Sequence, residues 1–223
     1  MRTAHIVYVN ESRRPMRGNG VWMFLLLLLS LPLSSCVSAM LDPGPPPPRL
    51  QLAPAMPARM TDKPVNRQIV VASPVSGAEI DNDRIALIFS GREVRYLGDA
   101  RWTGSVPVMV RGRLIEALEA TGGLRGVSDE LAGLVADVRL LTDIKQFALH
   151  YSSEDAVPVA ALEAGFRLLN LNNGRIMASR SVDIKVPAAG KDRADLAKAM
   201  EKALSDTLAD IAPWVVEEMR KMR

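Results

Sequence analysis

Apolar and polar residues alternate along much of the second half of the chain, which is the pattern of half-buried β-strands. Between Leu134 and Ile144 the apolar side chains fall mainly on even-numbered positions, whereas from Phe147 to Tyr151 they fall on odd-numbered ones. A change of phase within one strand predicts a β-bulge, because a bulge adds one residue to one strand of a pair. We therefore expect a long, bulged strand over residues 134–151.

Two further strands follow and form a predicted hairpin. Residues 159–171 and 175–186 are rich in apolar side chains, and Asn172-Asn173-Gly174 lies between them. Asn-Gly between two such runs is the strongest short-range signal for a β-hairpin. The apolar residues of the second run share one face, so we expect the other face to meet water.

The first half of the chain predicts shorter strands and a helix. Residues 68–72, 85–89 and 94–97 are apolar runs bounded by turn residues, and the last two predict a hairpin. Ser105 and Pro107 are typical of a helix start, and the apolar residues that follow recur at helical spacing until Gly122-Gly123.

The chain ends in a second amphipathic helix over residues 192–219, in which Pro213 predicts a kink. The predicted order is therefore strand, hairpin, helix, three long antiparallel strands and helix. Two helices packed on one face of a mostly antiparallel sheet bury the apolar surfaces of both layers. We expect an α+β fold of this kind, a two-layer sandwich.

The amino-terminal region has the pattern of a bacterial lipoprotein signal. Arg13, Arg14 and Arg17 precede an apolar run over residues 21–33, and Leu33-Ser34-Ser35-Cys36 follows. A basic region, a short apolar region and small residues before a cut form a secretory signal, and the apolar run is shorter than the roughly 20 residues of a membrane span. We expect the Cys36 thiol to take a diacylglycerol and to become the mature amino terminus.

Two features of the leader stay open. Ser12-Arg13-Arg14 also resembles a twin-arginine signal, whereas the strongly apolar run favours ordinary secretion, with translation starting at Met1 or Met16. The lipid attachment at Cys36 is expected in either case.

Prolines dominate the segment after Cys36, including the run from Pro45 to Pro48. Proline lacks an amide donor and has a fixed φ, so this segment predicts a semi-stiff, extended spacer. The predicted organisation is a signal peptide over residues 1–35, a lipidated cysteine with a proline-rich tether over 36–67, and a folded domain over 68–223.

Charge and cysteine content limit the function classes. The whole chain has 28 basic and 25 acidic residues, and residues 1–35 hold four of the basic and one of the acidic ones. The mature chain therefore has no net charge, which argues against nucleic-acid binding. Cys36 is the lone cysteine, so a disulfide within one chain is excluded.

Catalytic patterns are missing from the mature sequence. It contains one histidine, His150, which cannot build a zinc site with an acylated cysteine, and it has no Gly-x-Ser-x-Gly turn. Asp81-Asn82-Asp83 lacks the glycine and distal glutamate of a calcium loop. We expect no enzyme activity, no metal and no cofactor.

Arg101 and Trp102 are the candidate partner-binding residues. They lie just before the first predicted helix, and Tyr96 precedes them. A tryptophan here serves either as a core or edge packing residue or as a partner contact, and Arg101 beside it could stack or form an ion pair in an interface.

An ordered set of short motifs runs along the folded part of the chain. It comprises Val71-Ala72-x-Pro74, Arg84-Ile85, Tyr96, Arg101-Trp102-(x4)-Pro107, residues 137–144, Asn173-Gly174 and Val182-(x3)-Val186-Pro187. Over roughly residues 68–214 this set resembles the ABC-type transport auxiliary lipoprotein (PqiC-like) family. Many relatives carry a Tyr-Tyr-x-Leu strand after the cysteine, for which Leu50-Gln51-Leu52-Ala53-Pro54 is the only counterpart here.

The resemblance implies a non-enzymatic subunit of a mammalian-cell-entry (MCE) type system for phospholipids or sterol-like lipids. Its expected partners are an MCE-domain protein that bridges the periplasm and the ABC permease and ATPase, and it implies self-association into a ring. Val37 stands where aspartate would favour the inner membrane, so the outer membrane is expected. The alternative is a structural or assembly lipoprotein of outer-membrane biogenesis, which would contact a β-barrel.

Overall fold

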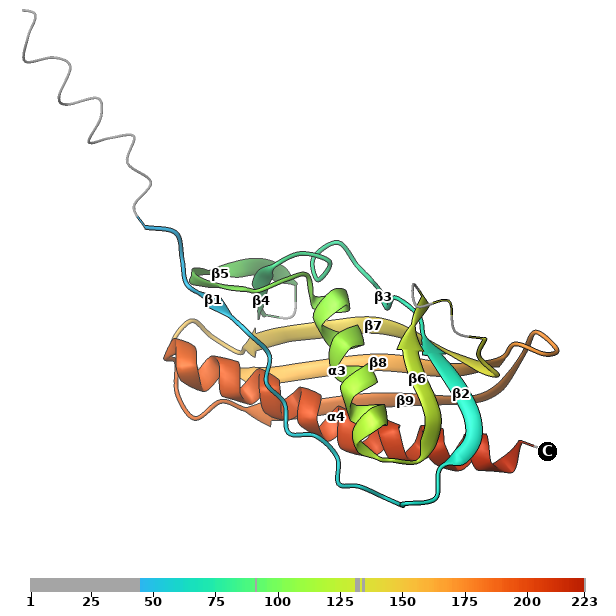
Figure 1. Cartoon of the computed structure of the whole chain (residues 1–223). Coiled ribbons are helices and arrows are strands. Elements are labelled where there is room, and N and C mark those ends of the chain that lie inside the picture. Colours follow the sequence, from blue (N-terminus) through green and yellow to red (C-terminus); the bar gives the residue numbers. More distant parts are fainter. Residues whose placement is uncertain (1–44, 91, 131–132, 134, 223) are drawn as a thin grey trace, which may run out of the picture. The chain divides into compact units, whose positions relative to one another are not determined.

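The computed structural model describes residues 45–222, except 91, 131, 132 and 134 (Figure 1). Within them the fold is α+β, with a nine-stranded mixed sheet and two helices packed against it. The elements in chain order are β1 (Arg49–Leu50), β2 (Val65–Val71), β3 (Val75–Ser76), β4 (Arg84–Phe89), β5 (Glu93–Trp102), α3 (Val106–Ala120), β6 (Leu124–Asp129), β7 (Val138–Tyr151), β8 (Val159–Asn170), β9 (Arg175–Pro187) and α4 (Arg193–Lys221). The predicted fold class is confirmed.

Strand β7 is the centre of the sheet. One edge of β7 pairs antiparallel with β8 along nearly its whole length, and β8 pairs antiparallel with β9. The other edge pairs in succession with β2, β3 and β4, all parallel to it. Parallel pairs of β6 with β2 and of β1 with β5, and the β4–β5 hairpin, complete the sheet.

The predicted bulge lies in β7. Ile144 pairs with Ala164 and Gln146 pairs with Glu163, so Lys145 is the extra residue. The bulge reverses the alternation, and Phe147 therefore points into the core like Ile144, both being 2% exposed.

The predicted hairpin between β8 and β9 is also confirmed. The Asn173 side-chain oxygen Oδ1 accepts a hydrogen bond of 3.0 Å from the Arg175 N–H, and Gly174 has φ of +69°. That left-handed conformation suits glycine because a Cβ atom would crowd the following carbonyl.

Helices α3 and α4 cover the same face of the sheet (Figure 1). Ser105 is the N-cap residue of α3, and Pro107 lies in the first turn of that helix. Asp192 is the N-cap residue of α4. Pro213 lies inside α4, which continues to Lys221, and the predicted kink at that residue stays a prediction. Both helices contribute fully buried side chains to a core that they share with the inner face of the sheet.

The structure differs from the sequence-based expectation at several strands. The sequence pattern did not predict β1, β3 or β6, and β5 extends to Trp102 instead of ending at Leu97. Residues 135–137 precede β7 without strand structure, and Leu134 lies outside the described residues. β6 is polar and contains Gly126, and a Cβ atom at Gly126 would approach the Gln68 side chain to 3.2 Å. With polar residues and a glycine in its six positions, β6 has no apolar alternation for a pattern search to find.

The proline-rich segment corrects the predicted domain boundary. The compact unit begins at Pro47, and Leu52 within the supposed tether is fully buried. Residues 47–67 of the predicted spacer therefore pack on the domain. Residues 36–44, with Cys36 and Val37, lie outside the described residues.

Replacing Gly174 by alanine should lower the free energy of unfolding by about 1 kcal/mol, because its φ is positive and alanine disfavours that region. Gly98→Ala is the matched control: Gly98 has no positive φ, and nothing lies within 4 Å of a Cβ atom built there. Urea unfolding of the two variants tests this, and equal midpoints would contradict the assigned turn.

Candidate functional site

Residues 47–64, which we call the strap, connect the amino-terminal region to the first long strand and cross the helical layer. The strap begins as β1, which pairs parallel with β5 in the register Arg49 to Arg101 and Leu50 to Trp102. The Pro48 carbonyl accepts a hydrogen bond of 3.1 Å from Arg101 N–H, and the Leu50 carbonyl accepts one of 2.9 Å from Thr103 N–H.

Beyond β1 the strap crosses α4. The Ala53 N–H donates to Glu201 Oε1 at 3.3 Å, and the Ala55 N–H donates to Ser205 Oγ at 2.8 Å. Leu52, between these contacts and β1, is part of the hydrophobic core. An extended segment rich in proline cannot satisfy its remaining N–H groups internally, so side chains of α4 accept from them.

The strap then reaches the carboxyl end of α3. The Met60 N–H donates to the Thr121 carbonyl at 2.8 Å, and the Val65 N–H donates to the Gly123 carbonyl at 2.9 Å. Gly122 has φ of +61°, and a Cβ atom there would come within 2.8 Å of the Thr61 carbonyl oxygen. The strap is thus held to both helices as well as to the sheet.

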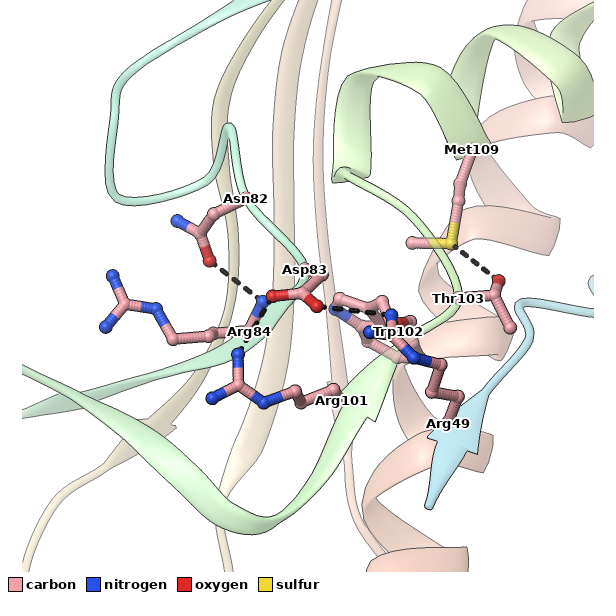
Figure 2. A network of polar contacts seen from close by, with 8 residues as sticks. All are labelled: Arg49, Asn82, Asp83, Arg84, Arg101, Trp102, Thr103 and Met109. Carbon is pink, nitrogen blue, oxygen red and sulfur yellow. Dashed lines mark hydrogen bonds and ion pairs between the residues drawn. The ribbon is translucent and has the colours of Figure 1, made fainter. Parts of the chain in front are cut away.

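An acidic residue joins the start of the strap to the β4–β5 hairpin (Figure 2). Asp83 Oδ2 lies 3.2 Å from the Arg49 guanidinium, and Asp83 Oδ1 lies 3.1 Å from that of Arg101. Arg49 also donates to the Trp102 carbonyl at 3.2 Å, and the Trp102 N–H donates to the Asp83 carbonyl at 2.7 Å. These groups, the Asp83 network, hold β1, β5 and the turn before β4 together.

Each ion pair of the Asp83 network is partly exposed to solvent. Arg49 and Arg101 keep 57% and 43% of their side-chain surface accessible, so each pair contributes at most about 1 kcal/mol. The network fixes the geometry of the strap more than it stabilises the fold.

Trp102 is a core residue in this structure and not an exposed partner contact. It is 1% exposed, and its ring stacks on Phe147 with centroids 6.2 Å apart. Of the two proposed partner-binding residues, Arg101 is therefore the one with accessible surface, and its guanidinium already engages Asp83.

A second charged group lies on the same hairpin. Arg95 bridges Glu93 at 2.7 Å and Glu154 at 3.0 Å. The hydrogen bond to Glu93 is the main reason that the pKa of Arg95 is raised, and the hydrogen bond from Arg95 holds the pKa of Glu93 below its usual value. Arg84 lies over the Tyr96 ring, 3.7 Å from its centroid, so this surface is built from cation–aromatic and ion-pair contacts.

A hollow of about 240 Å³ opens beside β4, β5 and β7. It is lined by Glu79, Ile80, Ala86, Ile88, Val94, Lys145, Gln146, Phe147 and Ala148. The space exists because Ala86 and Ala148, on neighbouring strands, are small. It is smaller than the roughly 300–1,000 Å³ of most ligand pockets.

His150 lies at the end of β7 beside Tyr151, as the sequence indicated. Its Nε2 atom is buried and has no hydrogen-bond partner among the described residues. Burial, reinforced by the positive charge of Lys185, lowers the pKa of His150. The neutral imidazole is therefore favoured in the folded protein.

Within the residues that the structure describes, no group of three His, Cys, Asp or Glu side chains could hold a metal ion. Over the same residues, no helix combines the length and the apolar composition that crossing a bilayer requires.

Solved structures share this architecture. The protein XCC0632 from Xanthomonas campestris is 23% identical with a TM-score of 0.69, over 77% of this chain and 96% of that one. A crystal structure of an uncharacterised protein matches at 14% identity and a TM-score of 0.59, over 77% of this chain and 99% of that one. PelC from Paraburkholderia phytofirmans, a dodecamer, reaches a TM-score of 0.39 at 15% identity, over 67% of this chain and 93% of that one. No curated protein matches the chain.

The fold and the strap define a two-layer α+β domain whose amino-terminal segment is built into its core. The model of the ABC-type transport auxiliary lipoprotein component matches residues 50–212, and the chain belongs to that family. It is thus a lipid-anchored auxiliary component of an ABC-type transport system in the cell envelope, and the family implies a non-catalytic role. The match begins inside the strap, which agrees with the corrected domain boundary.

Replacing Leu52 by alanine should lower the free energy of unfolding by about 2–4 kcal/mol, because a fully buried leucine leaves a cavity. The exposed neighbour Gln51 gives the control variant Gln51→Ala, expected within about 0.5 kcal/mol of the wild type. Urea unfolding measures both. A Leu52→Ala variant as stable as the control would mean that the strap is not part of the core.

The lowered pKa of His150 predicts how stability depends on pH. The unfolded chain binds this proton more readily than the folded one, so the free energy of unfolding should fall as the pH drops below about 6.5. His150→Gln should reduce that fall, as measured by urea unfolding at about pH 8 and about pH 5. An equal loss in both proteins would assign the acid sensitivity to other groups.

Proposed function

We propose that this auxiliary lipoprotein is attached through Cys36 and docks the periplasmic MCE-domain bridge of a lipid transporter. The single observation that carries the proposal is the strap: residues 47–64, which follow Cys36 in the sequence, are part of the folded domain. A docking subunit has to transmit the position of its anchor to its partner surface, and a strap bound to both layers does so.

The strap also defines two ends of the domain. β1 runs parallel to β5 and therefore opposite to β7, so the chain enters the domain near the carboxyl end of β7. The β8–β9 turn lies at the other end, because Asn170 pairs with Val138 at the start of β7 (Figure 1). A strand as long as β7 spans roughly 45 Å, which separates the two ends.

The end away from the chain entry is the better docking surface. Leu171 and Ile176 are 38% and 47% exposed there. A hollow of about 300 Å³ lies beside them, lined by Asn170, Met177, Glu218, Lys221 and Met222. Exposed apolar side chains with flexible methionines next to a polar rim are typical of protein contact surfaces.

Arg101 lies nearer the chain entry and is engaged by Asp83, so we assign it to holding the strap rather than to the partner. The outer membrane is the proposed location, on the basis of Val37 after Cys36. A ring of identical subunits, which the resemblance implies, also stays a proposal. The second candidate function, an assembly factor of the outer membrane, would place a β-barrel protein on the same exposed end.

A crosslinking pull-down of the full chain from envelope membranes tests the proposal. Wild type should recover an MCE-domain protein with its ABC permease, and Cys36→Ala should lose them because the domain leaves the membrane. Ile176→Glu should reduce recovery at least roughly tenfold, since a charge at an interface core costs several kcal/mol. Val108→Glu, at a similarly exposed valine on α3, is the matched control.

Recovery of a β-barrel protein in place of the transporter would support the assembly role and overturn the docking role. Loss of the partners with Arg101→Glu but not with Ile176→Glu would move the docking surface to the strap end.

A further inference from the structure

Strand β9 is a long edge of the sheet. It has 13 residues, and among the described residues it pairs with β8 alone. Its outer edge therefore presents a row of N–H and C=O groups that another strand could meet. Prolines, short length, β-bulges or charged side chains usually protect such an edge. In β9 the only proline is the last residue, and the one bulge, at Met177, lies in the first half of the strand. The charged residues of the second half, Asp183 and Lys185, have opposite signs, so they can attract a second copy of the same strand.

The carboxyl half of β9 is complementary to itself. Val182, Ile184 and Val186 are more buried than their neighbours and share the face toward α4, whereas Asp183 and Lys185 share the exposed face. Asp183 and Lys185 stand two residues apart on either side of Ile184. An antiparallel copy centred on Ile184 would place each aspartate opposite the other copy's lysine.

We infer that two copies of this chain pair antiparallel through β9, with Ile184 on the two-fold axis. The pairing joins two sheets into one continuous sheet. It sets Val182 opposite Val186 of the second copy beside the helices, and it forms two Asp183–Lys185 contacts between copies on the other face. Within one chain the two side chains are 3.0 Å apart but more than half exposed, so both are free to exchange partners.

Neighbouring registers lack this match. Centring the pair on Asp183 brings two aspartates face to face, and centring it on Lys185 brings two lysines together, which is destabilising. Centring it on Val182 places both charged side chains opposite serines, Ser181 and Ser179. The charges therefore select the register centred on Ile184.

The two-fold axis is also compatible with a single membrane. An axis perpendicular to the sheet leaves the helices and the strap of both copies on the same side of the joined sheet. Two anchored chains can then reach one bilayer, since residues 36–47 can extend up to roughly 40 Å. The interface is isologous, unlike the head-to-tail contacts of a ring made by rotation. The inference does not depend on the docking role proposed above.

Disulfide crosslinking of the full chain in its membrane tests the pairing. Ile184→Cys should form a covalent dimer under mild oxidation, because residues opposite each other in an antiparallel pair lie about 4.5–5.5 Å apart, within disulfide reach. Ile176→Cys on the same strand is the control. The two copies of that residue would lie roughly 50 Å apart in the proposed register, so it should stay monomeric.

Charge exchange in the Ile184→Cys background separates this interface from any other. Asp183→Lys and Lys185→Asp should each cut the crosslinked fraction several-fold, because each places like charges opposite one another. Co-expression of the two variants with different tags should restore a mixed dimer, since one copy then carries two lysines and the other two aspartates. A purely intramolecular role of the two residues gives no such rescue.

Equal crosslinking at positions 184 and 176, or a dimer insensitive to both charge changes, would overturn the inference. A larger assembly that persists in both charge variants would do the same and would favour a ring built on other surfaces. Sedimentation of detergent-extracted Asp183→Lys and Lys185→Asp without the added cysteine gives a second measurement of the dimer. Both side chains are exposed and lie outside the core, so a loss of the dimer in these variants would not reflect unfolding.

Discussion

The hydrogen bonding of β7 on both of its edges is the constraint on which the rest of the fold depends. β8 occupies one edge, and β2, β3 and β4 share the other, so strands from distant parts of the sequence meet on one backbone. The bulge at Lys145 lets both halves of β7 bury their apolar residues on the same face. That face receives α3 and α4, and the core between the two layers follows from it.

The strap depends on this core. Leu52 is buried where the helices and the sheet already provide apolar neighbours, and the Asp83 network holds β1 against a hairpin that itself pairs with β7. Family, fold and strap describe an anchored auxiliary subunit whose attachment segment is part of the domain.

Local sequence signals predicted the elements whose structure is locally determined. The alternation in β7, β8 and β9, the Asn173-Gly174 turn and the start of α3 at Ser105 and Pro107 were all visible in the sequence, as was the bulge. Pairing that depends on distant residues was not. β6 is a polar strand whose structure comes from its pairing with β2, and β1 is two residues long in a proline-rich segment. Trp102 shows the same limit, since its burial comes from contact with Phe147, far along the chain.

The pairing of β1 with β5 has a mechanical consequence. A pull directed along β1 would load the hydrogen bonds from Arg101 and Thr103 together in shear, so they would not open one after another. The buried Leu52 lies directly behind them and resists the same displacement. Such a load would therefore reach β1 and Leu52 before the central strands of the sheet, and the strap would be the first part of the domain to yield.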